Sequence, residues 1–245
     1  MKKSNISQSK SLSLISFIRD LYKTKDYIPL HIPRFNGNEK NYINECIDST
    51  YVSSVGKMVE SFEESLVSYT KIKYAVATVN GTSALHTSLK LAGVEKGDSI
   101  ITQSLTFVAT CNAINYCQAQ PIFLDIDKDT LGLSAESLES YLNDYCEIRD
   151  DGFCWERKTN SIIRACIPMH TFGFPVKLDE IRSLTRRYNI ILIEDAAESL
   201  GSFYKDKHTG IIGDIAIMSF NGNKIITSGG GGMIMTNSKQ IASAD

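Results

Sequence analysis

The chain has 245 residues, of which 26 are basic and 28 acidic, so its formal net charge at pH 7 is -2. This near balance, without a basic block, gives no electrostatic footprint for nucleic acid, and we expect no nucleic-acid partner. The amino terminus has no apolar run long enough for a signal peptide or a membrane span. We therefore expect a soluble, cytoplasmic protein without a membrane partner.

The cysteines and histidines carry no metal-binding pattern. The six cysteines form no CxxC pair, several lie inside apolar runs, and the four histidines form no HxxxH spacing. Free thiols in a reducing compartment explain this usage better than disulfides or zinc, so no metal site is predicted. His170 in "PMHTFG" is predicted to be a packed, hydrogen-bonded histidine.

Three helices are predicted before residue 74. Residues 1–30 are expected to form a polar amino-terminal segment and an amphipathic helix, since apolar residues recur there at helical spacing. Two further helices are predicted from stripes that we expect to face a core. The three stripes are Leu14, Phe17, Ile18 and Leu21, then Tyr42, Ile43, Cys46 and Ile47, and then Val59, Phe62, Leu66 and Tyr69.

From Tyr74 onward short apolar runs alternate with helical stretches. Strands are predicted at 74–79, 99–103, 120–126, 161–169, 190–195 and 214–220, with helices at 82–93, 107–117, 135–145 and 178–189. Continuous apolar strands separated by helices indicate βαβ units, so the fold class is α/β with a mainly parallel sheet. Residues 144–160 are expected to form a long exposed connection. Ligands of such sheets bind beyond the carboxyl ends of the strands.

The first strand end leads into "NGTSALH". Gly81 permits close backbone approach, Thr82 and Ser83 offer hydroxyls, and the new helix presents free N–H groups with a positive dipole end. These features favour a phosphate site. An ordinary glycine followed by a polar helix cap is the alternative, and neither a GxGxxG nor a GxxxxGK[ST] motif is present.

Another strand ends in adjacent carboxylates, Glu194 and Asp195. A carboxylate at the tip of a buried strand is costly unless it meets a cation, and a protonated pyridine nitrogen is one such cation. The alternative for Asp195 is a helix N-cap.

The last of these strand ends is followed by "SFNGNKIITSGGGG", in which Ser219 could reach the same phosphate and Lys224 the same ligand. A lone surface lysine is the alternative for Lys224. Together, a phosphate cradle, an acid at a strand end and a lysine in a polar loop are what pyridoxal 5'-phosphate (PLP) requires.

The motifs "NGTSALH", "LTFVATCNAI", "EDAAESLGS" and "SFNGNKIITSGGGG" resemble, in order and spacing, those of the DegT/DnrJ/EryC1/StrS sugar aminotransferases. The resemblance runs from about Ile28 to the last residue. It implies a three-layer sandwich, the large domain of a type I PLP-dependent transferase, over residues 31–245. Residues 28–63 and "PMHTFG" look most like the LegC-type branch, which makes nucleotide-linked 4-amino sugars for legionaminic-type nonulosonates.

The resemblance also implies roles for individual residues. Lys224 matches the lysine that bonds to the cofactor and moves the proton, and Asp195 matches the partner of the pyridine nitrogen. The remaining cofactor-binding positions are Gly81, Thr82, Ser83 and Ser219 at the phosphate, Phe107 stacked on the ring, and Glu198 near the phenolic edge. Glu198 stands where many relatives have glutamine or histidine, which leaves its role open.

The implied function is amino transfer from glutamate to a nucleotide-linked 4-keto-6-deoxy sugar, with UDP as the expected nucleotide. The resemblance also implies that the enzyme is a homodimer. A dehydratase on the same scaffold is disfavoured, because relatives of that type have histidine in place of the lysine at position 224. Family members continue into a small carboxyl-terminal domain, whereas this sequence stops at "SKQIASAD", so we expect either a fragment or a truncated gene product. A truncated PLP-binding or assembly module without activity is therefore the alternative function.

Overall fold

The computed structural model describes the backbone of residues 2–243 and the side chains of residues 9–243. The chain divides into two compact units, Met1–Arg34 and Phe35–Asp245. The first contains α1 (Lys2–Tyr22), which begins inside the predicted polar segment and includes the predicted stripe. Within the described residues, no helix combines the length and the apolar character needed to cross a membrane.

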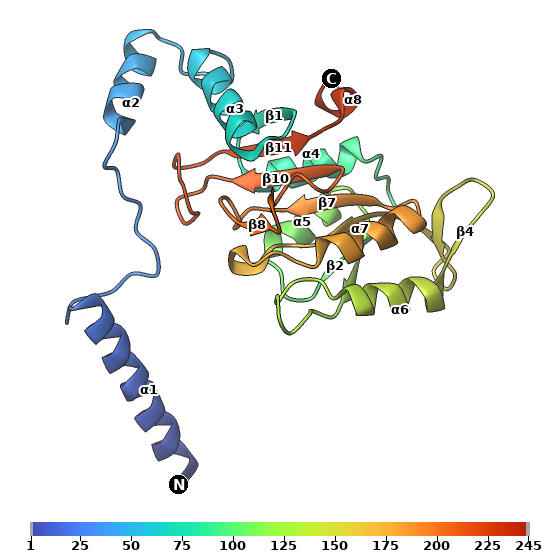
Figure 1. Ribbon diagram of the computed structural model, residues 1–245, viewed down its shortest axis with the longest axis horizontal. Coiled ribbons are helices and arrows are strands. Elements are labelled where there is room, and N and C mark those ends of the chain that lie inside the picture. The colour runs from blue at the N-terminus through green and yellow to red at the C-terminus, as the bar shows by residue number, and fades with distance from the viewer. Residues whose placement is uncertain (1, 244–245) are drawn as a thin grey trace. The chain divides into compact units, whose positions relative to one another are not determined.

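The second unit alternates helices and strands (Figure 1). Its helices are α2 (Glu39–Asp48), α3 (Lys57–Thr70), α4 (Gly81–Leu91), α5 (Val108–Tyr116), α6 (Ala135–Tyr145), α7 (Leu178–Arg187), α8 (Lys239–Ala242) and the single 3-10 turn η1 (Thr171–Gly173). Its strands are β1 (Tyr74–Thr78), β2 (Ser99–Gln103), β3 (Gln120–Leu124), β4 (Cys146–Ile148), β5 (Cys154–Glu156), β6 (Ser161–Ile167), β7 (Ile191–Asp195), β8 (Phe203–Tyr204), β9 (Lys207–His208), β10 (Ile215–Ser219) and β11 (Gly232–Thr236).

The central sheet has the strand order β1-β11-β10-β7-β6-β2-β3. The pairs β10/β7, β7/β6, β6/β2 and β2/β3 are parallel, whereas β11 is antiparallel to both β1 and β10. The predicted α/β class with a mainly parallel sheet is confirmed. The carboxyl ends of β1, β2, β6, β7 and β10 consequently meet at one edge of the sheet.

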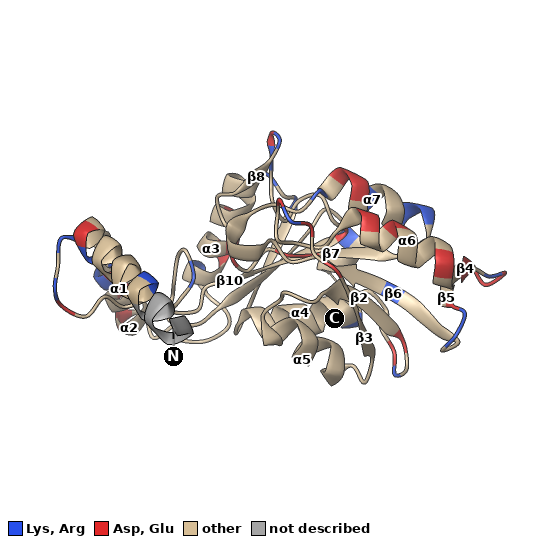
Figure 2. Ribbon diagram, turned by 90° about the horizontal axis from the view of Figure 1, so that it is seen from below, with Lys and Arg blue, Asp and Glu red and all other residues tan. Residues whose placement is uncertain are grey.

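Two helical layers cover the sheet. Figure 2 shows α6 and α7 over one face and α4 and α5 over the other. Under α6 and α7, Leu138 and Ile181 pack with Leu192 of β7, while under α4 and α5, Leu85 packs in the core that contains Ile193. Neighbouring residues of β7 thus enter different cores, as the alternation of side chains along a strand requires. These three layers are the predicted sandwich.

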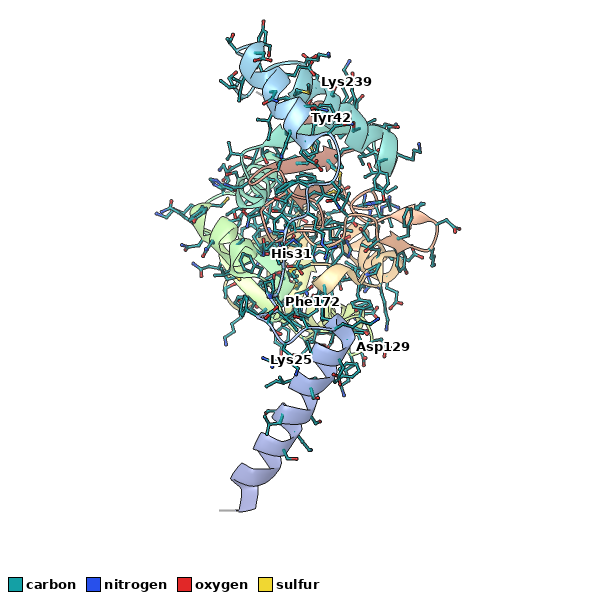
Figure 3. The ribbon with its side chains drawn as sticks, turned by 90° about the vertical axis from the view of Figure 1, so that its left-hand side faces the viewer. Lys25, His31, Tyr42, Asp129, Phe172 and Lys239 are labelled. Carbon is teal, nitrogen blue, oxygen red and sulfur yellow. The ribbon has the colours of Figure 1, made fainter. Side chains whose placement is uncertain are left out.

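Three features differ from the sequence prediction. The stripe of α2 does not face a core, since Tyr42 (Figure 3) is 54% and Ile47 60% exposed. The connection 144–160 contains a hairpin, β4 and β5, which extends the sheet beside β6. The strand β11 was not predicted, because "GMIMT" begins with the last of four consecutive glycines and glycine is depleted in strands.

Candidate active site

A cavity of about 250 Å³ opens at the carboxyl edge of the sheet, on the face covered by α4 and α5. Residues from five loops and strand ends line it, among them seven of the eight predicted site residues: Gly81, Thr82, Phe107, Asp195, Glu198, Ser219 and Lys224. Ser83, the eighth, does not line the cavity. Positions up to 143 residues apart in the chain are therefore gathered around one space, as the topology of a parallel sheet favours.

The floor of the cavity is the start of α4. The Asn80 side chain caps this helix by accepting a hydrogen bond from the Ser83 backbone N–H at 2.7 Å, so Ser83 contributes to the cap. Gly81 lies against Ser219, and a β-carbon added at position 81 would come within 2.8 Å of the Ser219 Cβ. A glycine is required there for β10 to end beside the helix start, where unpaired N–H groups favour an anion.

The four glycines 229–232 lead into β11, whose first residue is Gly232. A β-carbon at Gly232 would lie 2.4 Å from the carbonyl carbon of Asn80. The Gly231 N–H donates to the Val79 oxygen at 2.9 Å. Gly231 and Gly232 therefore pack against the turn that leads into α4, whereas a β-carbon at Gly229 would meet nothing within 4 Å.

Asp195 ends β7 and is only 3% exposed. Within the described chain its carboxylate accepts hydrogen bonds from the Thr110 hydroxyl at 2.8 Å and from the Ala197 N–H at 3.2 Å. Burial raises its pKa, and these two hydrogen bonds lower it only in part. A buried carboxylate with two neutral donors has room for a cation, and a protonated pyridine nitrogen fits that requirement.

Lys224 lies across the cavity, with a side chain 10% exposed. Its Nζ is 3.2 Å from Glu198 Oε1 and 5.6 Å from the centroid of the Phe107 ring. Phe107 precedes α5 and is 57% exposed, so one face of its ring is free for a planar ligand. The lone surface lysine suggested as the alternative does not describe this nearly buried amine.

Glu198 connects Lys224 to a strained turn. Its second oxygen, Oε2, accepts a hydrogen bond from the Phe172 N–H at 3.2 Å. Phe172 (Figure 3) has a φ of 54°, in the left-handed region that bulky residues rarely occupy. A β-carbon at Gly173 would lie 3.0 Å from the Glu198 carbonyl oxygen, so this turn packs closely against the backbone of Glu198.

Two residues that support the site, Thr110 and Gln103, were not singled out from the sequence. Thr110 follows Phe107 by one helical turn, a spacing that could have placed it beside Asp195. Gln103 is fully buried at the end of β2, where its amide accepts from Leu133 and Met169 N–H groups and donates to Thr171. Gln103 has little local signal: apart from the Leu105 carbonyl oxygen, its hydrogen-bond partners lie 30 to 68 positions away.

Comparison with known proteins shows the family to which this chain belongs. The sequence profile described as "DegT/DnrJ/EryC1/StrS aminotransferase family" matches residues 33–244. A GDP-perosamine synthase from Caulobacter vibrioides is 40% identical over 215 residues, which are 88% of this chain and 53% of that protein. The chain thus spans about half the length of the curated relatives that it matches.

Solved structures of related enzymes have the same fold. An aminotransferase from Psychrobacter cryohalolentis superposes with a TM-score of 0.76 at 29% identity, over 89% of this chain and 51% of that one. The Escherichia coli GDP-4-keto-6-deoxy-D-mannose-3-dehydratase, with bound hydrated PLP, has a TM-score of 0.74 at 25% identity, over 88% and 52%. The predicted fold of type I PLP-dependent transferases and the predicted cofactor, PLP, are confirmed.

Proposed function

Because this chain belongs to the DegT/DnrJ/EryC1/StrS aminotransferase family, we propose that it transfers an amino group from glutamate to C4 of a nucleotide-linked 4-keto-6-deoxy sugar. One observation carries the proposal. A nearly buried amine, a buried acid that forms no salt bridge with any described residue and an anion-favouring helix start face the same cavity. These are the groups that PLP chemistry requires of a protein.

The start of α4 holds the phosphate in this proposal. The N–H groups of Gly81 and Thr82 belong to the first turn of the helix and have no partner four residues earlier. The Thr82 and Ser219 hydroxyls add donors, and Ser83 acts through the cap that it forms with Asn80. The aligned peptide dipoles of α4 stabilise the negative charge.

Asp195 holds the protonated ring nitrogen. Thr110 and Ala197 orient the carboxylate from the side of α5 and from its own turn. An ionised Asp195 would keep the ring nitrogen charged. When it is bound, PLP supplies an electron-withdrawing ring and carries an amino group from donor to acceptor. Phe107 provides a flat apolar surface against which the ring packs.

Lys224 is the nucleophile and the proton carrier. Lys224 would hold the cofactor through Nζ, and as a neutral amine released by the donor it would take a proton from one carbon and deliver it to another. Glu198 holds the free ammonium of Lys224 at 3.2 Å. That ion pair is positioned to keep the amine near the reacting carbon throughout the exchange.

Several finer assignments belong to the same proposal. We assign residues 31–245 as the cofactor-binding domain and residues 1–30 as a separate amino-terminal segment. The enzyme acts as a homodimer in the cytoplasm, and its six free cysteines fit a reducing compartment. The resemblance of residues 28–63 to the LegC-type branch supports a UDP-linked substrate in nonulosonate synthesis. The Caulobacter vibrioides relative is named for a GDP-linked product.

The test is amino transfer itself. The protein is incubated with PLP, glutamate and either a UDP-linked or a GDP-linked 4-keto-6-deoxy sugar, and the products are identified by mass spectrometry. We expect conversion of the ketone to an amine with one nucleotide, and no conversion by Lys224→Ala. Loss of the C3 hydroxyl without gain of nitrogen would indicate a dehydratase. Cofactor binding without either product would indicate a PLP-binding module.

A further inference from the structure

Glu194, the residue before the candidate acid, points to the opposite face of β7. It is fully buried, as Asp195 nearly is, yet it does not line the cavity. Its carboxylate lies on the side of the sheet covered by α6 and α7. Nothing in the proposed chemistry uses this second carboxylate, so its buried charge needs a separate explanation.

Glu194 is saturated with donors. Oε2 accepts from His170 Nε2 at 3.0 Å and from the Gly210 N–H at 2.7 Å, and Oε1 accepts from the N–H groups of Ile212 at 2.8 Å and Gly213 at 2.5 Å. Burial would raise the Glu194 pKa, but the hydrogen bonds from His170 and these amides outweigh it and lower the pKa. Four donors satisfy an ionised carboxylate in a dry interior.

His170 is held in one orientation and hydrogen-bonds to β7 twice, through its ring to Glu194 and through its backbone to Asp195. The Val176 N–H donates to His170 Nδ1 at 3.3 Å, so the ring proton is on Nε2, which faces Glu194. The backbone N–H of His170 donates to the backbone carbonyl oxygen of Asp195 at 3.1 Å. The backbone N–H of Asp195 donates in turn to the carbonyl oxygen of Pro168 at 2.9 Å. The predicted packed, hydrogen-bonded His170 is confirmed.

The same carboxylate also fixes the next strand of the site. Gly210, Ile212 and Gly213 belong to the loop that enters β10, whose Ile217 pairs with Asp195 and whose Ser219 lines the cavity. Glu194 therefore joins three segments at the end of β7: the stretch 168–176, the loop 209–213 and β7 itself. The stretch 168–176 and the strand β10 both hydrogen-bond to the backbone at Asp195 and Ala196, through Pro168, His170 and Ile217.

We propose that Glu194 and His170 are positioning residues, which fix the direction in which the Asp195 carboxylate faces the cavity. The inference rests on the proposed function of Asp195 as the partner of a ring nitrogen. A charged hydrogen bond depends strongly on alignment. A small rotation at the end of β7 would therefore weaken that contact before it disrupted the fold.

The test compares PLP with an analogue in which a CH group replaces the ring nitrogen. The ratio of the two dissociation constants reports the contact of Asp195 with the nitrogen and is insensitive to changes that affect both ligands alike. In Glu194→Gln one carboxylate oxygen becomes an NH2 group that faces two N–H donors. We expect the preference for PLP to fall about tenfold, the scale of one misaligned charged hydrogen bond.

Glu156→Gln is the matched control. Glu156 is 3% exposed and accepts from the N–H groups of Lys158 and Thr159, but it lies on the β4/β5 hairpin, outside the site. Its pKa is also lowered, by hydrogen bonds that outweigh burial. This variant should lose stability and keep the wild-type preference for PLP, which separates general destabilisation from loss of positioning.

His170 provides a second pair of variants that does not depend on Glu194→Gln folding. His170→Phe keeps a ring and removes the donor to Glu194, whereas the amide nitrogen of His170→Gln can reach the place of Nε2. We expect His170→Phe to lose the preference and His170→Gln to retain most of it. Equal, wild-type preference in both, or in Glu194→Gln, would overturn the inference. A wild-type protein that binds neither ligand would instead contradict the proposed function.

Discussion

Glu194 and Asp195 are adjacent on one strand and are both buried, yet their surroundings shift their pKa values in opposite directions. Burial alone raises both. Glu194 accepts four hydrogen bonds and has a lowered pKa, whereas Asp195 accepts two and has a raised one. The number of donors, rather than depth, separates a carboxylate that holds the fold together from one that needs a ligand.

The two faces of β7 serve different purposes for the same reason. On the side of α6 and α7, Glu194 is enclosed by the loop 209–213, in which the N–H groups of Gly210, Ile212 and Gly213 donate to its carboxylate. On the side of α4 and α5, a cavity adjoins Asp195, and Lys224, whose charge lowers the Asp195 pKa, forms its ion pair with Glu198. Neighbouring titratable groups with divergent environments are characteristic of functional sites.

The largest expected effect comes from Asp195→Asn. The amide cannot keep the ring nitrogen charged, so the rate of amino transfer should fall about a thousandfold, the scale for one catalytic electrostatic contact. Without cofactor the variant should be more stable than the wild type by roughly 1 kcal/mol, because an uncompensated buried charge is removed. Steady-state rates and urea unfolding measure the two effects. A rate within tenfold of the wild type would contradict the assignment.

Glu194→Gln should show the opposite balance. Two donors lose their acceptor in the interior, which costs about 2 to 4 kcal/mol of unfolding free energy. Urea denaturation at pH 7 measures this cost, with Glu156→Gln as the comparison for a buried carboxylate outside the site. If Glu194→Gln were as stable as the wild type, the distinction between the two faces of β7 would not hold.

Gly81→Ala affects only the cavity face. The new methyl group would overlap Ser219, whose Cβ lies 2.8 Å from the added atom, so either β10 or the helix start must shift. We expect about tenfold weaker binding of PLP and a similar loss for inorganic phosphate. Isothermal titration with both ligands checks this. Unchanged phosphate affinity would place the anion site elsewhere.

Thr110→Val removes one of the two donors to Asp195. Losing this hydrogen bond should lower the free energy of unfolding by about 1 to 2 kcal/mol. It should also weaken PLP binding severalfold, since the Asp195 carboxylate keeps only the Ala197 N–H as a donor. Thr110→Ser retains the hydroxyl and serves as the control. Equal PLP affinities for the valine and serine variants would show that this hydrogen bond does not orient Asp195.

The smallest effect is the pH dependence of stability. The folded Asp195 has a pKa above its ordinary 3.8, so its unfavourable contribution develops as the pH rises above about 4. The folded Glu194 has a pKa below its ordinary 4.5, so its stabilising contribution is complete above that pH and is lost as the pH falls. Asp195→Asn should flatten the first limb and Glu194→Gln the second, in unfolding measured from pH 3 to 8. Identical profiles would contradict the comparison.

Much of the sheet and of the cavity-facing site could be predicted, because the signals were local. Continuous apolar runs and helical stripes placed the parallel strands and their helices within a few residues. Asp195 was recognisable as an acid at the end of such a strand, and Lys224 as a lysine in the polar loop that follows another. The strand β11 escaped prediction, since its stability comes from pairing with β1 and β10 on both sides rather than from its composition.

The remaining parts depend on contacts between distant segments. Glu194 and Asp195 appeared in the sequence as one acidic pair, and only the pleat of β7 and the loops around it assign them to separate faces. The positions of Gln103 and Thr110 likewise follow from partners 30 or more residues away. The stripe of α2 matched a buried helix, yet periodicity alone does not show what covers it.

The central claim is that the face of β7 bearing Asp195 forms a PLP site with Lys224. The most direct measurement is borohydride reduction of the protein mixed with PLP, followed by peptide mapping. The account predicts one modified lysine, Lys224, with no labelling of Lys224→Ala above background. A phosphopyridoxyl group on any other lysine, or no stoichiometric modification, would contradict it.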